Sequence, residues 1–491
     1  MISIQKNASQ LFAHFSQDTV LPDVLISTLC FDSREVTTGS AFVALGSVAG
    51  NRNDYIAKAL DLGAVLVLFD PSDGESVVDE RCFAVSDLKQ KIGTFLHDWF
   101  GQVTDQLSMI GITGTNGKSS VSFYISQMLD ALNKPCAVMG TLGYGRPNDL
   151  TETGMTTLPL EKLHGALAEL STNYQAVGME VSSHGLHQNR LAGVNISGAV
   201  YTNLSHDHLD YHGNMSEYAA AKAMLFKRPE LKFAVINGDD EYADVMSANS
   251  TAKSVLTYGQ QSGNDLVFSI ESISDEGITL IIGFENNETQ ALVPLYGAFN
   301  AYNAIAALGV ALQLGFSFDA SIKALGALKS VAGRMERVSD DVNLPLVLVD
   351  YAHTPDALEQ VLNTSQQHCK GSLTVVVGCG GDRDQRKRPL MGEIAARYAD
   401  SVIFTSDNPR SESPATIADQ MVASLSHTQY QNKYQIELDR ERAIRHAIKG
   451  AKVNDLVLIA GKGHEDYQEI NGQRSYFSDI AVARAVLEER P

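Results

Sequence analysis

The sequence is poor in cysteine and tryptophan, and it lacks a long uninterrupted hydrophobic run. Its 491 residues include only 5 cysteines and 1 tryptophan. The cysteines are odd in number and have no Cys-x-x-Cys spacing, which argues against structural zinc and favours a reducing compartment. No stretch approaches about 18 consecutive apolar residues, and the N-terminus lacks a basic segment followed by an apolar core. We therefore expect a cytoplasmic enzyme.

Basic residues are also scarce relative to acidic ones. The chain has 38 Lys and Arg against 58 Asp and Glu, a formal net charge of −20. Nucleic acid is an improbable partner for such a chain, because phosphate backbones are bound by basic stripes. An anionic small substrate is compatible with the composition if cations gather in one cleft. The length exceeds what one core supports, so we expect about three domains.

The most informative stretch is residues 109–120, MIGITGTNGKSS. An apolar run at 109–112 predicts a buried parallel strand, the following glycines predict a tight turn, and an amphipathic helix begins at Ser119. Such a turn directs backbone N–H groups at phosphate oxygens, while Lys118 supplies charge and Ser119 offers a hydroxyl to Mg²⁺. The predicted ligand is a nucleoside triphosphate.

The match to a phosphate-binding loop is incomplete. The strict pattern requires glycine five residues before Gly117, where this sequence has Ile112. A glycine-rich turn without a ligand is the alternative interpretation. The Gly-Lys-Ser run after a plausible strand favours the phosphate loop.

The N-terminal region, residues 1–105, reads as a small α/β domain. Apolar runs at 41–45 and 64–69 flank a helical pattern at 54–62. The turn at 32–40 either binds a ligand or merely connects, and the sequence alone favours a connector.

Residues 106–335 show a clearer alternation of strands and helices, and polar residues follow the strands. In an open parallel sheet, ligands bind beyond the carboxyl ends of strands. Glu180 follows the third run, a His-rich segment follows the fourth, and Asp239 and Asp240 follow the fifth. We predict strands at 109–113, 137–140, 176–181, 198–203 and 233–237.

Residues 336–491 repeat the pattern and carry a group of basic residues that would form the cationic cleft. The predicted strands are 346–350, 373–378, 401–406 and 456–460. The basic residues are Arg383, Arg386, Lys387, Arg388 and Arg410.

Glu180 and His208 are candidate ligands for a divalent metal beside the triphosphate. His206, His208 and His212 alternate as in a loop or a strand edge. They lack the His-Glu-x-x-His spacing of a zinc hydrolase, so Mg²⁺ or Mn²⁺ is preferred. For His206 and His212, a role in satisfying loop backbone is an equally good interpretation.

Two further basic residues have alternative interpretations. Lys222 lies in YAAAKAMLF, where burial would favour a neutral amine able to take up CO₂ as a carbamate. The residues alone favour an ordinary lysine whose charged end reaches solvent. Arg410 follows a strand in Asp-Asn-Pro-Arg and could bind a carboxylate through two hydrogen bonds, or pair with a neighbouring acid on the surface.

The sequence resembles the Mur ligases of bacterial cell-wall synthesis over nearly its whole length. The motifs are highly specific in combination. They are GTNGKSS (114–120), EVSSHGLHQNR (180–190), NLSHDHLDYH (203–212), GAFNAYN (297–303), GRME (333–336), DYAHTPDAL (350–358), GCGGDRD (378–384), DNPR (407–410) and GKGHED (461–466).

The resemblance implies an α/β protein of three domains. Residues 1–105 would bind the UDP end of a substrate, 106–335 would form a parallel-sheet ATPase domain of phosphate-loop type, and 336–491 would form a Rossmann-like domain that closes over an amino acid. It also implies ATP and Mg²⁺, a carbamate on Lys222, and addition of meso-diaminopimelate to UDP-N-acetylmuramoyl-L-alanyl-D-glutamate. We expect a monomer without nucleic-acid or membrane partners.

The resemblance also implies roles for single residues. The catalytic residues would be Lys118, Lys222 and His208, and the metal ligands Ser119, Glu180, His208 and carbamylated Lys222. ATP would contact Gly114, Thr115, Asn116, Gly117, Lys118, Ser119, Ser120, Asn300, Arg334 and Asp350. The UDP-linked dipeptide would contact Ser33, Thr156, Thr157, Ser182, Gln188 and Arg190. Diaminopimelate would contact Arg383, Asp407, Asn408, Pro409, Arg410, Gly461 and Glu465.

The sequence departs from the family pattern at a few positions. His206 stands where relatives usually have arginine, Met155 stands where asparagine is common, and Ser119 and Ser120 replace threonines. The serines keep the hydroxyl, so only local substrate contacts are affected by the departures.

The implied reaction begins when the substrate's glutamate γ-carboxylate attacks the γ-phosphate of ATP and forms an acyl phosphate. The amine of diaminopimelate then displaces phosphate. Two alternatives share the ATP site, namely a ligase that adds lysine and one that adds glutamate to a folate. A nucleotide-sugar-binding regulator with an inactive ATPase is disfavoured by the intact set of Lys118, Ser119, Glu180, His208 and Lys222.

Overall fold

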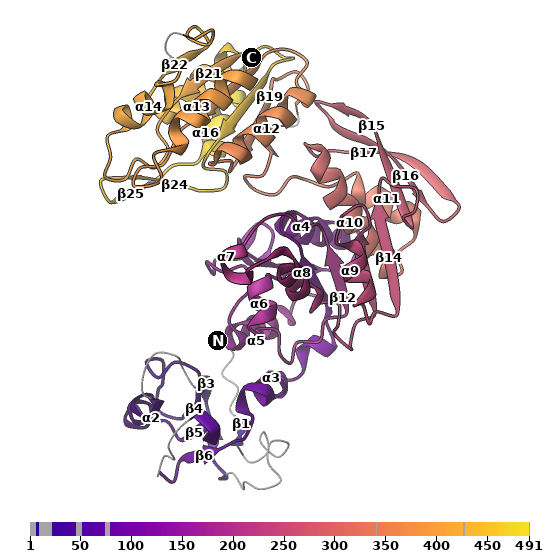
Figure 1. Cartoon of the computed structure of the whole chain (residues 1–491), viewed down its shortest axis with the longest axis vertical. Helices are drawn as coiled ribbons and strands as arrows, with labels where there is room; N and C mark the ends of the chain where they lie inside the picture. The colour runs from indigo at the N-terminus through magenta and orange to yellow at the C-terminus, as the bar shows by residue number, and fades with distance from the viewer. Residues whose placement is uncertain are drawn as a thin grey trace. The chain divides into compact units, whose positions relative to one another are not determined.

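The computed structural model describes residues 6–8, 22–45, 52–73, 79–339, 341–425 and 428–490. These residues divide into two compact units, Met1–Ile236 with Asp240–Leu256, and Asn237–Asp239 with Thr257–Pro491. Strands alternate with helices through most of the chain (Figure 1), which confirms the α/β class. The predicted domain boundaries at 105 and 335 stay predictions. Among the described residues no helix is long and apolar enough to cross a membrane.

The first unit begins with a small parallel sheet in the order β3-β4-β5-β6. Apolar residues of α3, including Phe95 and Trp99, pack on one face of this sheet, and Ile56 and Ala59 of α2 pack on the other. The predicted helix and both predicted strands are present. The elements are β1 (Lys6–Asn7), β2 (Leu25–Ile26), β3 (Thr28–Cys30), β4 (Ser40–Ala44), α2 (Arg52–Asp61), β5 (Leu66–Phe69), η1 (Pro71–Asp73), β6 (Cys82–Ala84), α3 (Leu88–Trp99) and η2 (Val103–Asp105).

The rest of the first unit is built on a larger sheet in the order β10-β9-β8-β11-β7-β12-β13. Strands β8, β11, β7, β12 and β13 are parallel, so their carboxyl ends lie at one edge. The elements are β7 (Ser108–Thr113), α4 (Lys118–Ala131), β8 (Cys136–Gly140), β9 (Gly143–Arg146), β10 (Asp149–Thr151), α5 (Leu160–Leu170), β11 (Ala176–Glu180), α6 (Ser183–His187), β12 (Gly198–Tyr201), α7 (Leu209–His212), α8 (Met215–Ala223), β13 (Phe233–Asn237), α9 (Ala243–Ala248) and β14 (Ser254–Gly259).

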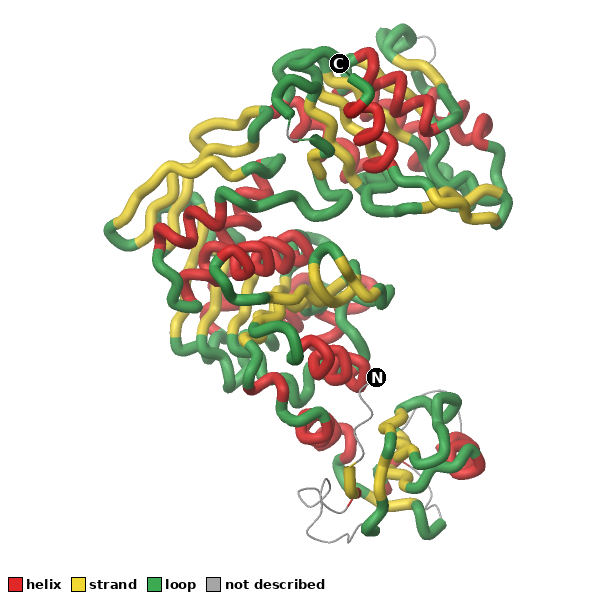
Figure 2. The backbone as a smooth tube through the Cα atoms, turned by 180° about the vertical axis from the view of Figure 1, so that it is seen from behind, coloured by secondary structure: helices red, strands yellow, loops and turns green. Residues whose placement is uncertain are grey.

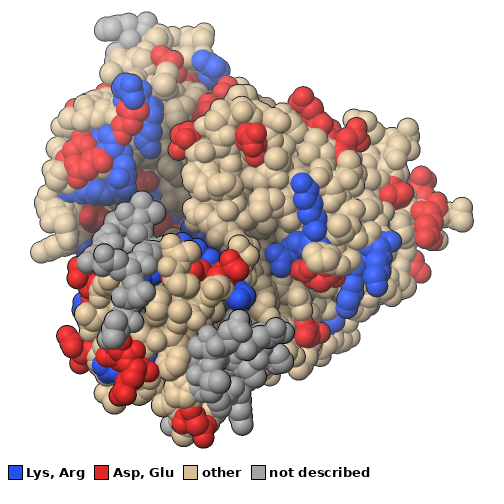
Figure 3. Space-filling view, turned by 60° about the horizontal axis from the view of Figure 1, so that its bottom comes forward, with Lys and Arg blue, Asp and Glu red and all other residues tan. Residues whose placement is uncertain are grey.

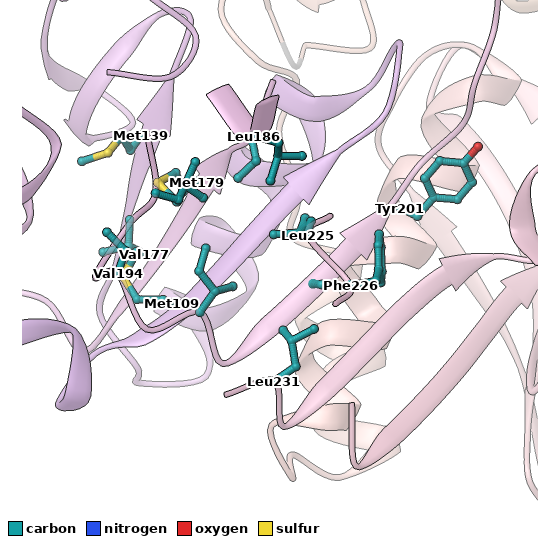
Figure 4. Close-up of a cluster of buried hydrophobic side chains, with 14 of the residues drawn as sticks. Met109, Met139, Val177, Met179, Leu186, Val194, Tyr201, Leu225, Phe226 and Leu231 are labelled. Carbon is teal, nitrogen blue, oxygen red and sulfur yellow. The ribbon is translucent and has the colours of Figure 1, made fainter. Parts of the chain in front are cut away.

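Alternating residues of this sheet fill two cores. Met109, Val177, Met179 and Tyr201 belong to a cluster that also contains apolar residues of α5, α6 and α8 (Figure 4). Helix α4 packs on β7, β8 and β11 with the remaining buried side chains. Because apolar residues are buried on both faces, each strand reads as a continuous hydrophobic run, which is why the sequence predicted all five strands.

The second unit contains an antiparallel ribbon, β15 with β16 and β16 with β17, and two helices that pack on it (Figure 2). These strands were not predicted from the sequence, since their outer residues are mixed in polarity. The elements are β15 (Leu266–Ser274), β16 (Gly277–Phe284), β17 (Asn287–Val293), α10 (Ala298–Gln313) and α11 (Phe318–Leu325).

The carboxyl-terminal part of the second unit is a sheet in the order β18-β19-β23-β20-β21-β22 with helices on both faces. Leu348 and Val375 face α12, α13 and α14, whereas Val349 and Val376 face α15 and α16. The elements are β18 (Glu336–Arg337), β19 (Leu346–Asp350), α12 (Pro355–His368), β20 (Leu373–Val377), α13 (Lys387–Tyr398), β21 (Ser401–Phe404), α14 (Pro414–Val422), β22 (Tyr434–Ile436), α15 (Arg440–Gly450), β23 (Leu456–Ala460), β24 (Tyr467–Ile470), β25 (Gln473–Tyr476) and α16 (Asp479–Glu488).

Candidate active site

The loop between β7 and α4 is the tight strand-to-helix turn that the sequence predicted. Gly114 has φ +153°, and a Cβ there would lie 1.9 Å from Thr202 Oγ1, so only glycine fits. The backbone N–H of Thr115 donates to Asn203 O at 2.8 Å, and that of Asn116 donates to Asn203 Oδ1 at 3.0 Å. Residues that follow β12 thus hold the loop in place.

Two lysines donate to one carbonyl oxygen in this loop. Lys118 Nζ lies 2.9 Å from Gly114 O and 2.8 Å from Thr115 O, and Lys222 Nζ lies 2.8 Å from Gly114 O. Helix α8 carries Lys222, which is 1% exposed. The interpretation of Lys222 as an ordinary lysine reaching solvent is therefore wrong.

Burial perturbs both amines. Loss of solvation, together with the nearby charge of Lys118, lowers the pKa of Lys222 to about 6. Burial also lowers the pKa of Lys118, against an opposing effect of Glu180. At neutral pH the Lys222 amine is therefore largely uncharged, which is the form that reacts with CO₂.

Glu180 lies at the end of β11 and is 1% exposed. Its Oε1 accepts from the N–H of Thr141 at 3.0 Å and its Oε2 accepts from the Thr141 hydroxyl at 3.1 Å. A Cβ on Gly140 would lie 2.1 Å from Oε1, so the carboxylate occupies space that glycine leaves open. Burial raises the pKa of Glu180, while Lys118 and a hydrogen bond from Ser119 oppose the rise. Thr141 was not predicted as a site residue, because it lies in none of the recognised motifs.

The donor set near the loop suits a hard divalent cation. It offers the Ser119 hydroxyl and the Glu180 carboxylate, both oxygen ligands. The described residues hold no group of three His, Cys, Asp or Glu side chains able to bind a metal ion. A metal here would need further oxygen ligands, which phosphates or a carbamate on Lys222 would provide.

His208 lies in a group of aromatic side chains beside Lys222. Its ring centroid is 5.0 Å from that of His184 and 6.2 Å from that of Tyr218, and the Lys222 amine is 4.5 Å from the Tyr218 ring centroid. His208 has φ +53° and precedes α7. In the described chain no hydrogen bond or ring contact joins His208 to Glu180.

The prediction of a loop or strand edge for the three histidines is wrong for His212, which ends helix α7. Its Nε2 is 2.9 Å from Ser183 Oγ, and its ring stacks on Tyr218 at 5.1 Å. Burial lowers the pKa of His212 and of His184. His206 is exposed, in the loop before α7.

Most residues expected to contact the UDP-linked dipeptide come together. Thr157 Oγ1 lies 3.1 Å from Ser182 Oγ, and Arg190 donates to Gln188 Oε1 and to Thr157 O. Thr156 Oγ1 lies 3.0 Å from Thr141 Oγ1, which connects this group to Glu180. Ser33 lies apart from this group in the sequence, buried in the turn that follows β3 of the small sheet. Met155 is 39% exposed.

Three residues expected to contact ATP lie in the second unit. Asn300, near the start of α10, donates to Tyr296 O at 2.8 Å. Asp350, at the end of β19, accepts from the N–H groups of Met335 and Ala352. Burial raises the pKa of Asp350, and Arg334, whose guanidinium lies 5.0 Å from the Tyr351 ring centroid, opposes the rise.

The residues expected to bind the amino acid also meet, at the carboxyl ends of β20, β21 and β23. Arg410 Nη1 donates to Gly381 O at 2.8 Å, and in the described chain it forms no ion pair with an acidic side chain. Hydrogen bonds from Ser411 and the nearby charge of Arg410 lower the pKa of Asp382, so pairing of Arg410 with an acid stays an alternative to binding a substrate carboxylate. Asn408 Nδ2 donates to Glu465 Oε2 at 2.9 Å.

The remaining members of this group lie on the same three loops. A Cβ on Gly461 would lie 2.7 Å from Asp407 Oδ2. A Cβ on Gly380 would lie 3.0 Å from Arg410 Nη1 and 3.8 Å from Arg383 Cγ, which places the two arginines beside each other. The N–H of Glu412 donates to Pro409 O.

Basic side chains occur in separate groups on the surface. On the face in Figure 3, Lys and Arg side chains are interspersed with Asp and Glu.

Comparisons with known proteins give consistent matches. Residues 112–311 match the model of the Mur ligase middle domain, and residues 333–463 match that of the Mur ligase, glutamate ligase domain. UDP-N-acetylmuramoyl-L-alanyl-D-glutamate--2,6-diaminopimelate ligase of Pseudomonas syringae pv. tomato is 40% identical over 486 residues, 98% of each chain. The Coxiella burnetii protein of the same name is 40% identical over 474 residues, covering 95% of this chain and 96% of that one.

Two solved structures are also similar to this chain. A structure of UDP-N-acetylmuramoyl-L-alanyl-D-glutamate--2,6-diaminopimelate ligase superposes with a TM-score of 0.80 and 37% identity, covering 99% of each chain. A structure of MurF from Acinetobacter baumannii gives a TM-score of 0.63 at 18% identity, covering 94% of this chain and 97% of that one, which shows a shared fold.

Proposed function

The chain belongs to the Mur ligase family, and from this we propose that it is an ATP-dependent ligase that adds meso-diaminopimelate to UDP-N-acetylmuramoyl-L-alanyl-D-glutamate. The relatives at about 40% identity carry that activity in their names. The observation that carries the proposal is the meeting of Lys118 and Lys222 at Gly114 O, next to the buried carboxylate of Glu180.

The loop residues Gly114 to Ser120 would hold the triphosphate. Lys118 now donates to two loop carbonyls, and its ammonium would move to phosphate oxygens when the nucleotide binds. Its role would be to offset charge on the transferring phosphoryl group. Asn300, Arg334 and Asp350 are proposed to complete the ATP contacts.

Ser119, Glu180, His208 and a carbamate on Lys222 would hold Mg²⁺, which neutralises phosphate charge when bound. The protein's part is to keep the Lys222 amine uncharged, so that it can become an anion instead of a cation beside the metal. Thr141 fixes the Glu180 carboxylate through two hydrogen bonds.

Thr156, Thr157, Ser182, Gln188, Arg190 and Ser33 are proposed to bind the UDP-linked dipeptide and present its γ-carboxylate. That carboxylate would attack the γ-phosphate of ATP, releasing ADP and leaving an acyl phosphate. The amine of diaminopimelate would then attack the acyl carbon and release phosphate. The chain supplies positioning and charge, with no covalent intermediate on the protein.

Arg410 is the proposed reader of the second carboxylate of diaminopimelate. Its φ of +50° and its hydrogen bond to Gly381 O hold the guanidinium in one place, beside Arg383. Lysine has no second carboxylate and would leave this guanidinium unpaired, at a cost in binding.

We also propose that the chain has three domains, 1–105, 106–335 and 336–491. We propose further that it is a cytoplasmic monomer with no nucleic-acid or membrane partner.

The test is a ligation assay with ATP, Mg²⁺, the UDP-linked dipeptide and a panel of amino acids. We expect amide formation with meso-diaminopimelate and little with lysine. ADP release should require the dipeptide and the diamino acid together. Steady ADP release with neither, or equal use of lysine, would refute the proposal.

A further inference from the structure

Lys462 is a fully buried lysine at the amino-acid site for which the proposed reaction has no use. It follows β23, directly after Gly461, and its side chain is 0% exposed. Burying an ammonium group is costly unless acceptors surround it. Its partners therefore indicate what the residue does.

The Lys462 ammonium contacts two of the residues proposed to bind the amino acid. Its Nζ lies 3.2 Å from Asn408 Oδ1 and 3.3 Å from Glu465 Oε2. The ring of Tyr467 lies 5.3 Å away and covers the amine. Asn408 and Glu465 come from different loops, after β21 and after β23, so the lysine joins the two loops.

These contacts fix the orientation of the Asn408 amide. Its Oδ1 accepts from Lys462 Nζ and also from the N–H of Glu469 at 2.9 Å, so two donors identify the oxygen end. Its Nδ2 is then the donor to Glu465 Oε2 at 2.9 Å. One N–H of Asn408 remains for a ligand, and a flipped amide would offer an oxygen there instead.

The same contacts hold the Glu465 carboxylate in place. Its Oε2 accepts from both Lys462 and Asn408, which holds the carboxylate in one rotamer. The Lys462 ammonium also pairs with this carboxylate, whose side chain is 20% exposed. A carboxylate held in this way is a suitable acceptor for a substrate ammonium group.

We propose that Lys462 is a positioning residue for the diamino acid, acting through the Asn408 amide and the Glu465 carboxylate. This inference rests on the proposed function. Lys462 does not touch the substrate. It keeps a donor at Asn408 for a substrate carboxylate and an acceptor at Glu465 for a substrate ammonium, so its loss weakens amino-acid binding and leaves ATP binding intact.

The first experiment compares Lys462→Met with Lys462→Gln in the ligation assay. We expect Lys462→Met to raise KM for meso-diaminopimelate about tenfold, because the Asn408 oxygen then keeps only the Glu469 N–H as a donor and the Glu465 carboxylate loses one of its two donors. Its kcat and its KM for ATP should stay within twofold. Lys462→Gln keeps an N–H donor, so it should recover most of the lost affinity.

The matched control is Lys449→Met on α15, because Lys449 is 58% exposed and pairs with Glu489 at 3.1 Å on the surface. We expect no change in either KM. An unchanged KM for the diamino acid in Lys462→Met, with product formed by the wild type, would overturn the positioning role alone. A wild type that forms no product would overturn the proposed function as well.

The second measurement is a double-mutant cycle with Asn408→Ala. If Lys462 acts through the Asn408 amide, Lys462→Met should raise KM less than about threefold once the amide is gone. A full tenfold rise in both backgrounds would point to general destabilisation and overturn the proposal. Should Lys462→Met fail to fold, Lys462→Gln is measured in both backgrounds. An effect confined to the enzyme with Asn408 supports the proposal, and an equal or absent effect overturns it.

Discussion

The nucleotide loop and the amino-acid site treat buried charge in opposite ways. At the loop, the buried side chains of Lys118, Lys222 and Glu180 form no ion pair among the described residues. Burial lowers the pKa of each lysine and raises that of Glu180, so it favours the uncharged form of all three.

At the amino-acid site, by contrast, the fully buried cations have acidic partners. Arg388 binds Glu412 through two hydrogen bonds of 2.8 Å, and Arg440 binds Asp479 through two of 2.7 Å.

The difference indicates what each site lacks before its ligand binds. Charges that are buried and unpaired are unfavourable until a ligand supplies the missing charge, as a triphosphate with a divalent cation would. Charges paired within the protein cost less and hold the loops in one conformation. The first site is therefore completed by its ligand. In the second, the loops are already held in place, and the ligand would supply the acidic partner of Arg410.

The largest expected effect comes from removing the unpaired lysine. Lys222→Ala should lower the ligation rate by about 10²- to 10³-fold, since one preorganised charge is typically worth that much. Added short carboxylic acids should restore part of the rate by supplying the anion. Activity near that of the wild type would remove Lys222 from the reaction and erase the contrast between the sites.

The next effect tests the preformed site. Arg410→Ala should raise KM for meso-diaminopimelate by about 10- to 100-fold and change KM for ATP little, because a charged hydrogen-bond pair is lost. Arg386→Ala is the control, since that guanidinium is 90% exposed and pairs with Asp384. Equal changes in both KM values for Arg410→Ala would place Arg410 outside the amino-acid site.

The pH dependence of stability sharpens the comparison further. The pKa of Lys222 is about 6 in the folded protein and near 10.4 when unfolded, so the unfolded chain binds the extra proton between these values. Burial of the Lys222 amine lowers the free energy of unfolding of the wild type most below pH 6. This loss of stability diminishes as the pH rises toward 10, by up to about 1.4 kcal/mol per pH unit.

The measurement compares the unfolding of Lys222→Met with that of the wild type in CO₂-free buffer. The variant should be the more stable protein at pH 6.5, and its advantage should shrink at pH 9. A constant difference would show that the Lys222 amine does not titrate in this range.

The smallest effect concerns the two positions that depart from the family pattern. His206 is exposed and Met155 is 39% exposed. His206→Arg and Met155→Asn should change unfolding free energy by less than about 0.5 kcal/mol, as substitutions at the surface usually do. A change above tenfold in KM for the UDP-linked dipeptide would instead assign the position to that substrate.

The parallel strands could be predicted from sequence because both of their faces are buried. All nine strands predicted from residue 106 onward are present, and 233–237, 346–350 and 456–460 match their observed bounds. The ribbon of β15, β16 and β17 escaped prediction, because its strands bury only some of their residues and their polarity follows tertiary packing rather than a simple pattern.

The site was predictable in part. Gly114, Lys118 and Glu180 lie close in sequence to strand ends, so their meeting followed from the sheet topology. The burial of Lys222 could not be predicted in this way, because it depends on contacts with residues more than 100 positions away in the chain. Thr141 lies in none of the quoted motifs. Lys462 lies in the motif GKGHED (461–466), but its role was not predicted, since a hydrogen-bonding role is visible only when the partners are placed.

Arg440 has a further consequence for substrate choice. Its guanidinium donates to Ser406 O, beyond the end of β21, and to Ala460 O, at the end of β23, while Asp479 fixes its orientation. The spacing between the two loops that hold Asn408 and Glu465 is thereby set by the size of one rigid planar group. Such a site has little freedom to contract around a shorter diamino acid, so chain length should be discriminated by geometry as well as by charge.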